Sequence, residues 1–194
     1  MTTYSQHTAL IVVDMQNDFA DPAGSLFVTG GDALVGAINA EIIHAAAVGA
    51  SVVYTQDWHP ESTPHFAKDG GVWPVHCVAD TWGAQFHPQL IVAGPTVRKG
   101  INGEDGYSGF TMRDPMTGET IPTELTALLR RRGIRSVVVI GLALDYCVKA
   151  TALDAAGEDW PTTAPLHLTA PVNLEPHHGT DAIKEMKNAG IRTE

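Results

Sequence analysis

Two groups of residues in this sequence have types and spacings that support chemistry. The segment "DWHPESTPHF", residues 57–66, holds a carboxylate and two imidazoles, and a third imidazole follows in "WPVHC", residues 73–77. Imidazole and carboxylate ligands suit Zn²⁺, Fe²⁺ or Mn²⁺ and leave coordination positions open for water or substrate. A polar loop without metal is the alternative, because short motifs of this kind also arise by chance. The candidate metal ligands are Asp57, His59, His65 and His76.

The second group centres on Cys147, which follows "GLALDY" at the expected start of a helix. A helix N-terminus favours a thiolate, so we expect the pKa of this thiol to be lowered. Lys99 can add positive charge, and Asp14 can take the thiol proton and pass it to a leaving amine. Backbone N–H groups near Ala143 and Cys147 can hold a developing oxyanion. This arrangement suits acyl transfer, whereas a lone cysteine is commonly a small buried residue, as we expect for Cys77.

Short apolar runs alternate with helical patterns along the chain, which predicts the elements that position these residues. The alternation favours a three-layer α/β/α fold with a mainly parallel sheet. The segment 159–172 contains three prolines, so its strand should be poor or lie at the sheet edge. Strands are expected at 8–14, 51–55, 95–98, 136–141, within 159–172 and at 191–193, and helices at 31–50, 122–133, 147–157 and 179–190.

The candidate residues share a position relative to the predicted strands. Ligands of open α/β sheets bind beyond the carboxyl ends of the strands. Asp14, Asp57 with His59, Lys99 and Cys147 each follow a different strand, so they should meet at one edge of the sheet. This shared position favours the catalytic interpretation of Cys147 over simple burial. The Gly-rich segment 100–119 is a long loop of the kind that is usually functional or mobile.

Composition limits the classes of protein that fit. The 194 residues are enough for one domain, which we expect to span residues 1–194. The net charge of −10, with only 12 Lys and Arg, argues against nucleic-acid binding. No long apolar run or signal peptide is visible, so we expect no membrane partner. Two cysteines do not make a disulfide framework, and a cytoplasmic location fits best.

The order and spacing of several motifs resemble one known family. The chain is similar over nearly its whole length to the nicotinamidase/pyrazinamidase branch of the isochorismatase-like hydrolases. That resemblance implies a six-stranded mainly parallel sheet and hydrolysis of nicotinamide, and also of pyrazinamide, in NAD salvage. Nicotinamide would give nicotinate and ammonia through a thioester on Cys147. The matching motifs are "VVDMQNDF" (12–19), "YTQDWHP" (54–60), "WPVHC" (73–77), "RKG" (98–100), "YSGF" (107–110) and "GLALDYCV" (141–148).

The resemblance also implies roles for individual residues. Asp14, Lys99 and Cys147 correspond to the catalytic triad. Asp57, His59 and His76 correspond to ligands of one divalent metal ion, Zn²⁺ in preference to Fe²⁺ or Mn²⁺, which would hold the pyridine nitrogen of the substrate. His65 falls at a ligand position where family members differ. The implied substrate-binding residues are Phe19 and Trp73, which would sandwich the ring, Tyr107, which would line the pocket, and Ala143 and Leu144, which adjoin an expected cis peptide bond.

Three other functions are compatible with the same fold. A vinyl-ether hydrolase would need neither Cys147 nor the histidines, and an N-carbamoyl amide hydrolase would keep the cysteine without the histidine cluster. A binding or assembly module without activity should have lost Asp14, Lys99 or Cys147, and this chain keeps all three. The expected partner is a small aromatic amide. Family members often assemble, so a homo-oligomer is also an open expectation.

Overall fold

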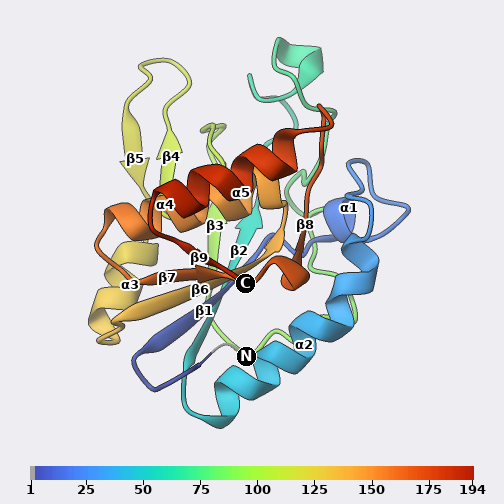
Figure 1. Ribbon diagram of the computed structural model, residues 1–194. Coiled ribbons are helices and arrows are strands. Elements are labelled where there is room, and N and C mark those ends of the chain that lie inside the picture. The colour runs from blue at the N-terminus through green and yellow to red at the C-terminus, as the bar shows by residue number, and fades with distance from the viewer. Residues whose placement is uncertain (1–2) are drawn as a thin grey trace.

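The computed structural model describes residues 3–194 and is built around one seven-stranded parallel sheet (Figure 1). The strand order is β3-β2-β1-β6-β7-β9, with β8 beside β6. The prediction of a mainly parallel three-layer α/β fold is confirmed, but the predicted number of six strands is wrong. The strands are β1 (Thr8–Val13), β2 (Ser51–Asp57), β3 (Thr96–Lys99), β6 (Ser136–Leu142), β7 (Thr162–Ala164), β8 (Thr169–Ala170) and β9 (Arg192–Thr193).

The seventh strand arises because the proline-rich segment 159–172 divides in two. Pro165 has no N–H for a sheet ladder, and a 3₁₀ turn over Leu166–Leu168 follows it. The chain then returns as β8, which pairs with the last residues of β6. The first part, β7, is only three residues long, but it lies between β6 and β9. The expectation of a poor strand therefore holds, whereas the expectation of an edge position is wrong.

Helices cover both faces of the sheet (Figure 1). One hydrophobic cluster joins α2 to Leu10 and Val12 of β1, and a second joins α3, α4 and α5 to Ile11 and Val13. Side chains of a strand alternate between faces, so β1 contributes to both clusters and is fully buried. The helices are α1 (Asn17–Ala20), α2 (Gly31–Ala47), α3 (Leu125–Arg131), α4 (Lys149–Gly157) and α5 (His178–Asn188).

The long Gly-rich segment is not entirely a loop. Its last part forms β4 (Thr111–Arg113), which pairs antiparallel with β5 (Thr120–Pro122). Pro122, the first residue of the expected helix, belongs to β5 instead, and α3 begins at Leu125. The helix ends near Gly133, as predicted, where φ is +64°.

The carboxyl ends of the strands form the edge where the candidate residues gather. Asp57 and Lys99 end β2 and β3 and are register partners, and Asp14 directly follows β1. After β6, a π-helical turn over Leu144–Val148 precedes α4, so Cys147 lies inside this turn and not at the first residue of a helix.

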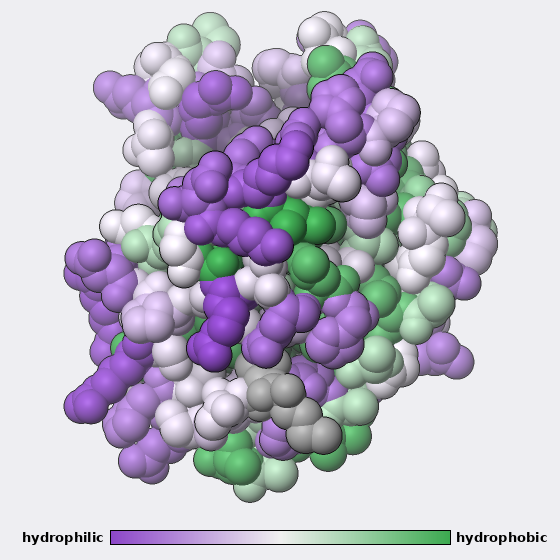
Figure 2. Space-filling view, in the orientation of Figure 1, coloured by the Kyte–Doolittle hydropathy of each residue, from purple (hydrophilic) through white to green (hydrophobic). Residues whose placement is uncertain are grey.

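Hydrophilic residues dominate the face that carries α5 (Figure 2). This distribution agrees with the excess of 22 acidic over 12 basic residues. Within residues 3–194, no helix combines the length and the apolar character that crossing a bilayer requires.

Candidate active site

Asp14, Lys99 and Cys147 lie together in the interior at the sheet edge. The Lys99 Nζ atom is 2.9 Å from Asp14 Oδ2 and 3.7 Å from Cys147 Sγ. All three side chains are buried. The structure therefore brings together a carboxylate, an ammonium and a thiol that come from three different strand ends.

The Cys147 thiol differs from the sequence-based expectation. Burial raises its pKa well above the ordinary value, Lys99 opposes this shift, and the nearby Asp14 and Asp57 carboxylates reinforce it. The expected lowering by a helix N-terminus does not prevail because the thiol is enclosed and has two carboxylates beside it. Cys147 is thus a neutral thiol in the free protein and needs a base to become a nucleophile.

Asp14 is suited to be that base. Burial raises its pKa, while the Lys99 ammonium and a hydrogen bond from Thr55 lower it in part. The Thr55 hydroxyl donates to Asp14 Oδ1 at 2.6 Å, whereas Oδ2 is the oxygen next to Lys99. Asp14 has a left-handed backbone with φ of +47°, which is uncommon outside glycine and often marks functional sites.

The Lys99 ammonium joins this group to Asp57. Its Nζ atom also contacts Asp57 Oδ1 in a buried ion pair. Burial alone would lower the pKa of Lys99, but the Asp14 and Asp57 carboxylates raise it well above the ordinary value. Lys99 therefore remains charged and compensates two buried carboxylates.

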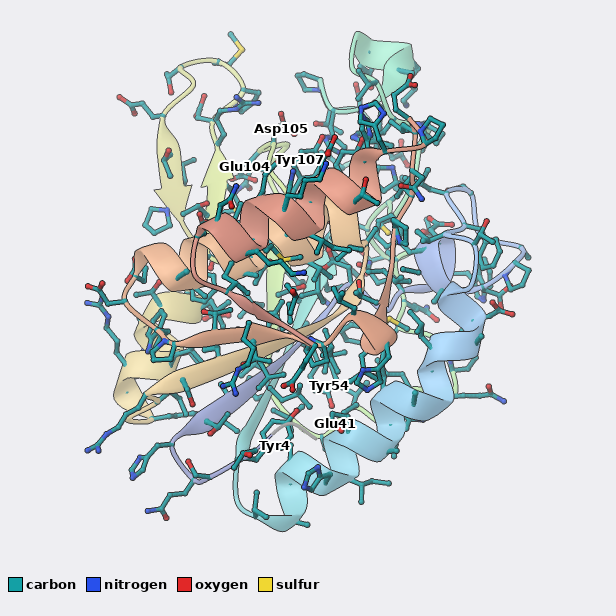
Figure 3. All side chains as sticks on the ribbon, in the orientation of Figure 1. Tyr4, Glu41, Tyr54, Glu104, Asp105 and Tyr107 are labelled. Atoms are coloured by element: carbon teal, nitrogen blue, oxygen red, sulfur yellow. The ribbon has the colours of Figure 1, made fainter. Side chains whose placement is uncertain are left out.

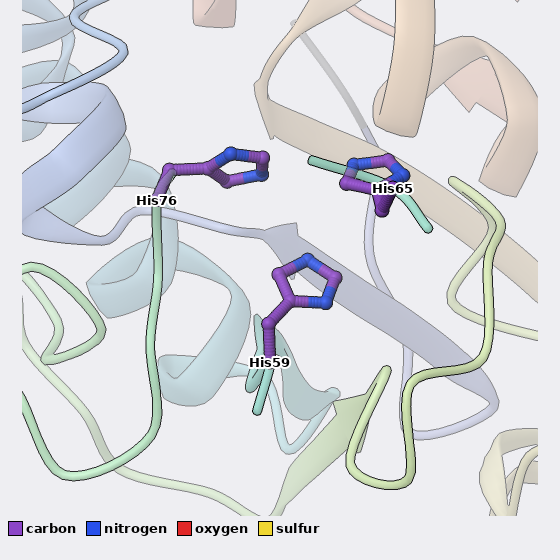
Figure 4. A group of neighbouring side chains, drawn as sticks. All are labelled: His59, His65 and His76. Atoms are coloured by element: carbon purple, nitrogen blue, oxygen red, sulfur yellow. The ribbon is translucent and has the colours of Figure 1, made fainter. Parts of the chain in front are cut away.

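Three imidazoles form the second half of the site and turn toward one another (Figure 4). One ring nitrogen from each of His59, His65 and His76 lies within 4.8 Å of the others. Both ring nitrogens of His59 are buried and lack a hydrogen-bond partner, which is costly unless a ligand satisfies them. Burial lowers the pKa of His76 to about 4, so it is a neutral imidazole near pH 7. The donor set fits a divalent metal ion.

Asp57 lies between the two halves of the site. Its Oδ2 atom is 3.7 Å from His59 Nε2 and 4.0 Å from His76 Nε2, on the side opposite Lys99. Burial alone would raise the pKa of Asp57, but the Lys99 ammonium and the nearby His59 hold it well below the usual range. An ionised carboxylate that faces the imidazoles completes a possible set of four ligands.

An aromatic pocket, partly open to solvent, leads to these groups. Phe19, Trp73 and Tyr107 line it as predicted from the resemblance, together with Ala143. A cis peptide bond is present, but it joins Leu142 to Ala143, one bond before the expected position between Ala143 and Leu144. Leu144 does not line this pocket, because it points into the hydrophobic cluster beneath α3 and α4. The pocket also involves residues that the sequence analysis did not select, namely Leu26, Val28, Leu142, Tyr146 and Val172.

Several supporting residues were also missed. The Gln16 amide donates to the carbonyl of Asp57 at 2.7 Å and accepts from its N–H at 2.8 Å, so it fixes the backbone of a candidate ligand. The Asp105 carboxylate accepts a hydrogen bond from His65 Nδ1 at 2.8 Å, and the Thr55 hydroxyl donates one to Asp14. Gln16 lies in a quoted motif, but nothing in its spacing signals this contact.

Comparisons with known proteins place the whole chain in one family. Residues 8–193 match the isochorismatase domain. The chain is 39% identical to the nicotinamidase/pyrazinamidase of Mycobacterium tuberculosis, across 94% of this chain and 96% of that protein. The pyrazinamidase of Pyrococcus horikoshii, solved with zinc, has a TM-score of 0.85 and 36% identity, covering 97% of this chain and 98% of that one. PnC1 of L. infantum, solved with nicotinate, has a TM-score of 0.89 and 38% identity, covering 100% and 95%.

The parallel α/β sheet, the buried residues at its carboxyl edge and these similarities define a hydrolase that acts on amides. The chain belongs to the isochorismatase family, and the resemblance seen in its motifs is confirmed.

Proposed function

We propose that this protein is a nicotinamidase that converts nicotinamide to nicotinate and ammonia and also accepts pyrazinamide. This proposal rests mainly on the contacts of Lys99, whose Nζ atom lies 3.7 Å from Cys147 Sγ and also pairs with Asp14. The similarity to nicotinamidases and a pyrazinamidase supports the choice of substrate. The reaction would serve NAD salvage by returning nicotinate for nucleotide synthesis.

The proposed first half-reaction is acyl transfer to sulfur. Asp14 takes the proton of Cys147, and the thiolate attacks the carboxamide carbon of the substrate. The N–H groups of Ala143 and Cys147 stabilise the negative oxygen that forms. Asp14 then gives its proton to the amine, the C–N bond breaks, and ammonia leaves a thioester on Cys147.

The second half-reaction returns the enzyme to its starting state. Asp14 accepts a proton from water, which attacks the thioester carbon. The C–S bond breaks, and the proton on Asp14 passes to the sulfur of Cys147. The product leaves as nicotinate after its new carboxyl group gives the second proton of the water to solvent. Lys99 stays charged throughout and lowers the free-energy cost of a negative charge on Asp14 or Cys147.

The aromatic pocket supports a flat ring as the substrate. Phe19 and Trp73 offer apolar faces, and Tyr107 closes the pocket next to Trp73, whose ring centroid is 6.5 Å away. Asp57, His59, His65 and His76 would hold a divalent metal ion, for which zinc is the first candidate. Such an ion supplies a Lewis acid that anchors the ring nitrogen of the substrate.

The alternative of an N-carbamoyl amide hydrolase uses the same cysteine. The histidine cluster and the apolar pocket favour an aromatic amide instead, because a carbamoyl substrate has no ring nitrogen to anchor.

A test of the proposed function compares the two cysteines. Cys147→Ala should reduce ammonia release from nicotinamide by more than about a thousand-fold, since no other nucleophile is in place. Cys77→Ala is the matched control, because Cys77 is also buried and its thiol donates to the carbonyl of Gly83 at 3.9 Å. This control should remain active, and mass spectrometry of acid-quenched wild-type protein should detect a nicotinoyl group on Cys147. Appreciable turnover by Cys147→Ala would refute the thioester mechanism.

A further inference from the structure

The Asp105 carboxylate is held from three sides. Its Oδ1 atom lies 2.8 Å from His65 Nδ1 and accepts the N–H of Gly106 at 2.8 Å. Its Oδ2 atom accepts from Arg113 Nη2 at 2.8 Å. The backbones of Asp105 and Arg113 also exchange two hydrogen bonds, of 2.8 and 2.6 Å, at the end of β4. The hairpin β4–β5 therefore fixes the carboxylate that faces His65.

The same segment also forms part of the pocket wall. Tyr107 lies two residues after Asp105, and both are labelled above α5 in Figure 3. The Tyr107 hydroxyl accepts from Trp73 Nε1 at 3.1 Å, and the N–H of Trp73 reaches the carbonyl of His65 at 3.4 Å. A closed ring of contacts thus runs through His65, Asp105, Tyr107 and Trp73.

The carboxylate also defines which nitrogen of His65 can bind a ligand. With the Nδ1 proton donated to Asp105, Nε2 keeps its lone pair. His76 uses Nδ1 differently, on the carbonyl of Pro74 at 2.7 Å, and neither ring nitrogen of His59 has a partner. Within residues 3–194, His65 therefore differs from His59 and His76, because a carboxylate bonds to its Nδ1 atom and orients its ring.

We propose that Asp105 is a positioning residue that orients His65 toward a bound metal ion and couples the metal site to the Tyr107–Trp73 wall of the pocket. Occupation of the metal site would hold the His65 ring in place, and His65 would in turn restrain Asp105 and the segment that carries Tyr107. This inference rests on the proposed function for its metal, but it concerns zinc binding and loop order, which are measured without substrate.

Zinc affinity of the full-length protein gives the first test. The zinc dissociation constant is measured by competition with a chromophoric chelator, without nicotinamide. Asp105→Ala should raise this constant about 10- to 100-fold, as loss of an outer partner of a ligating histidine does. Asp105→Asn should raise it less, because the amide oxygen can still accept from Nδ1, and Arg113→Gln should have the smallest effect of the three.

Amide hydrogen exchange gives the second test and separates positioning from general stability. Zinc should slow exchange in residues 103–113 of the wild-type protein, and this protection should be lost in Asp105→Ala.

Two control variants change other carboxylates. Asp114→Asn removes a nearby charge without touching His65, and Glu158→Gln breaks a carboxylate–arginine pair of 2.6 Å with Arg130 on the far surface. Both should keep the zinc dissociation constant within about twofold of wild type.

The outcomes are distinct. Wild-type zinc affinity in Asp105→Ala, unchanged exchange in residues 103–113 on zinc binding, or a wild-type protein that binds no zinc would each overturn the inference. If Asp105→Ala does not fold, the test uses the zinc dissociation constants of Asp105→Asn and Arg113→Gln together with the amide exchange of the wild-type protein. A wild-type protein that binds zinc with loop protection but releases no ammonia from nicotinamide would refute the proposed function and leave this inference standing.

Discussion

At the scale of single residues, burial disfavours the charged form of both the candidate nucleophile, Cys147, and its candidate base, Asp14. Burial raises the pKa of Cys147 and of Asp14, and Lys99 opposes both shifts. Transfer of the proton from sulfur to carboxylate exchanges one buried anion for another beside the same ammonium. The proposed chemistry therefore needs little change in the total charge of the site.

The pH dependence of the reaction should report on Asp14. This base acts in its ionised form, so kcat/KM should fall as the pH drops through its raised pKa. The Thr55 hydroxyl stabilises the ionised form, so Thr55→Val should raise the pKa of Asp14 and move the acidic limb to higher pH. A hydrogen bond to a charged group contributes about 1.5–3 kcal/mol, which predicts a shift of about one to two pH units.

Two variants control this pH experiment. Thr55→Ser keeps the hydroxyl, so its acidic limb should stay near that of the wild type. Thr162→Val removes a buried hydroxyl that bonds the carbonyl of Trp160 at 2.8 Å, away from the site, so it should cost stability without moving the limb. An acidic limb that is the same in Thr55→Val and wild type would argue against Asp14 as the base.

At the scale of elements, the turn after β3 brings the two halves of the site together. Gly100 has φ of +78°, and a Cβ atom there would lie 2.6 Å from His59 Nδ1. Only a residue without a side chain allows β3 to deliver Lys99 while His59 packs directly over the turn.

Replacement of Gly100 separates backbone strain from crowding of the metal site. Gly100→Ala should lower the free energy of unfolding by about 1–2 kcal/mol and also weaken zinc binding, because the methyl group displaces the His59 ring. Gly118→Ala is the matched control, since its φ is +74° and no atom lies within 4 Å of an added Cβ. Urea unfolding should show similar losses for both variants, and chelator competition should show weaker zinc binding for Gly100→Ala alone. Equal zinc affinity in the two variants would contradict this role of the turn.

The sequence predicts the elements that follow strong local patterns. Asp14, Lys99 and Cys147 could be placed together because parallel strands end at one edge. The hairpin β4–β5 has strands of three residues, too short for a periodic signal, and so it was missed. Contacts such as those of Gln16 with Asp57 and of His65 with Asp105 join residues 41 and 40 positions apart, and no local pattern encodes them.

At the scale of the whole molecule, one sheet supports two hydrophobic clusters. Ile38 of α2 belongs to the first and Leu129 of α3 to the second, and both are fully buried on opposite faces of the sheet. Because β1 contributes to both clusters, we expect the two faces to unfold together.

Core truncations test this cooperativity. Ile38→Ala and Leu129→Ala should each lower the free energy of unfolding by about 2–5 kcal/mol, because each leaves a cavity. Ile43→Ala on the exposed side of α2, where the side chain is 58% exposed, should change it by no more than about 0.5 kcal/mol. Circular dichroism and tryptophan fluorescence should give coincident urea transitions in every variant. Two separate transitions would show that the faces are independent.

The position of Lys99 has one more consequence. Ligand atoms of Asp14, Asp57 and Cys147 lie within 4.8 Å of one another, a grouping that would suit a cation, and the ammonium of Lys99 contacts all three residues. This positive charge is tethered by covalent bonds, so no chelator can extract it and no shortage of trace elements can deplete it. Loss of a metal ion held by the proposed ligands would therefore still leave one positive charge beside the sulfur.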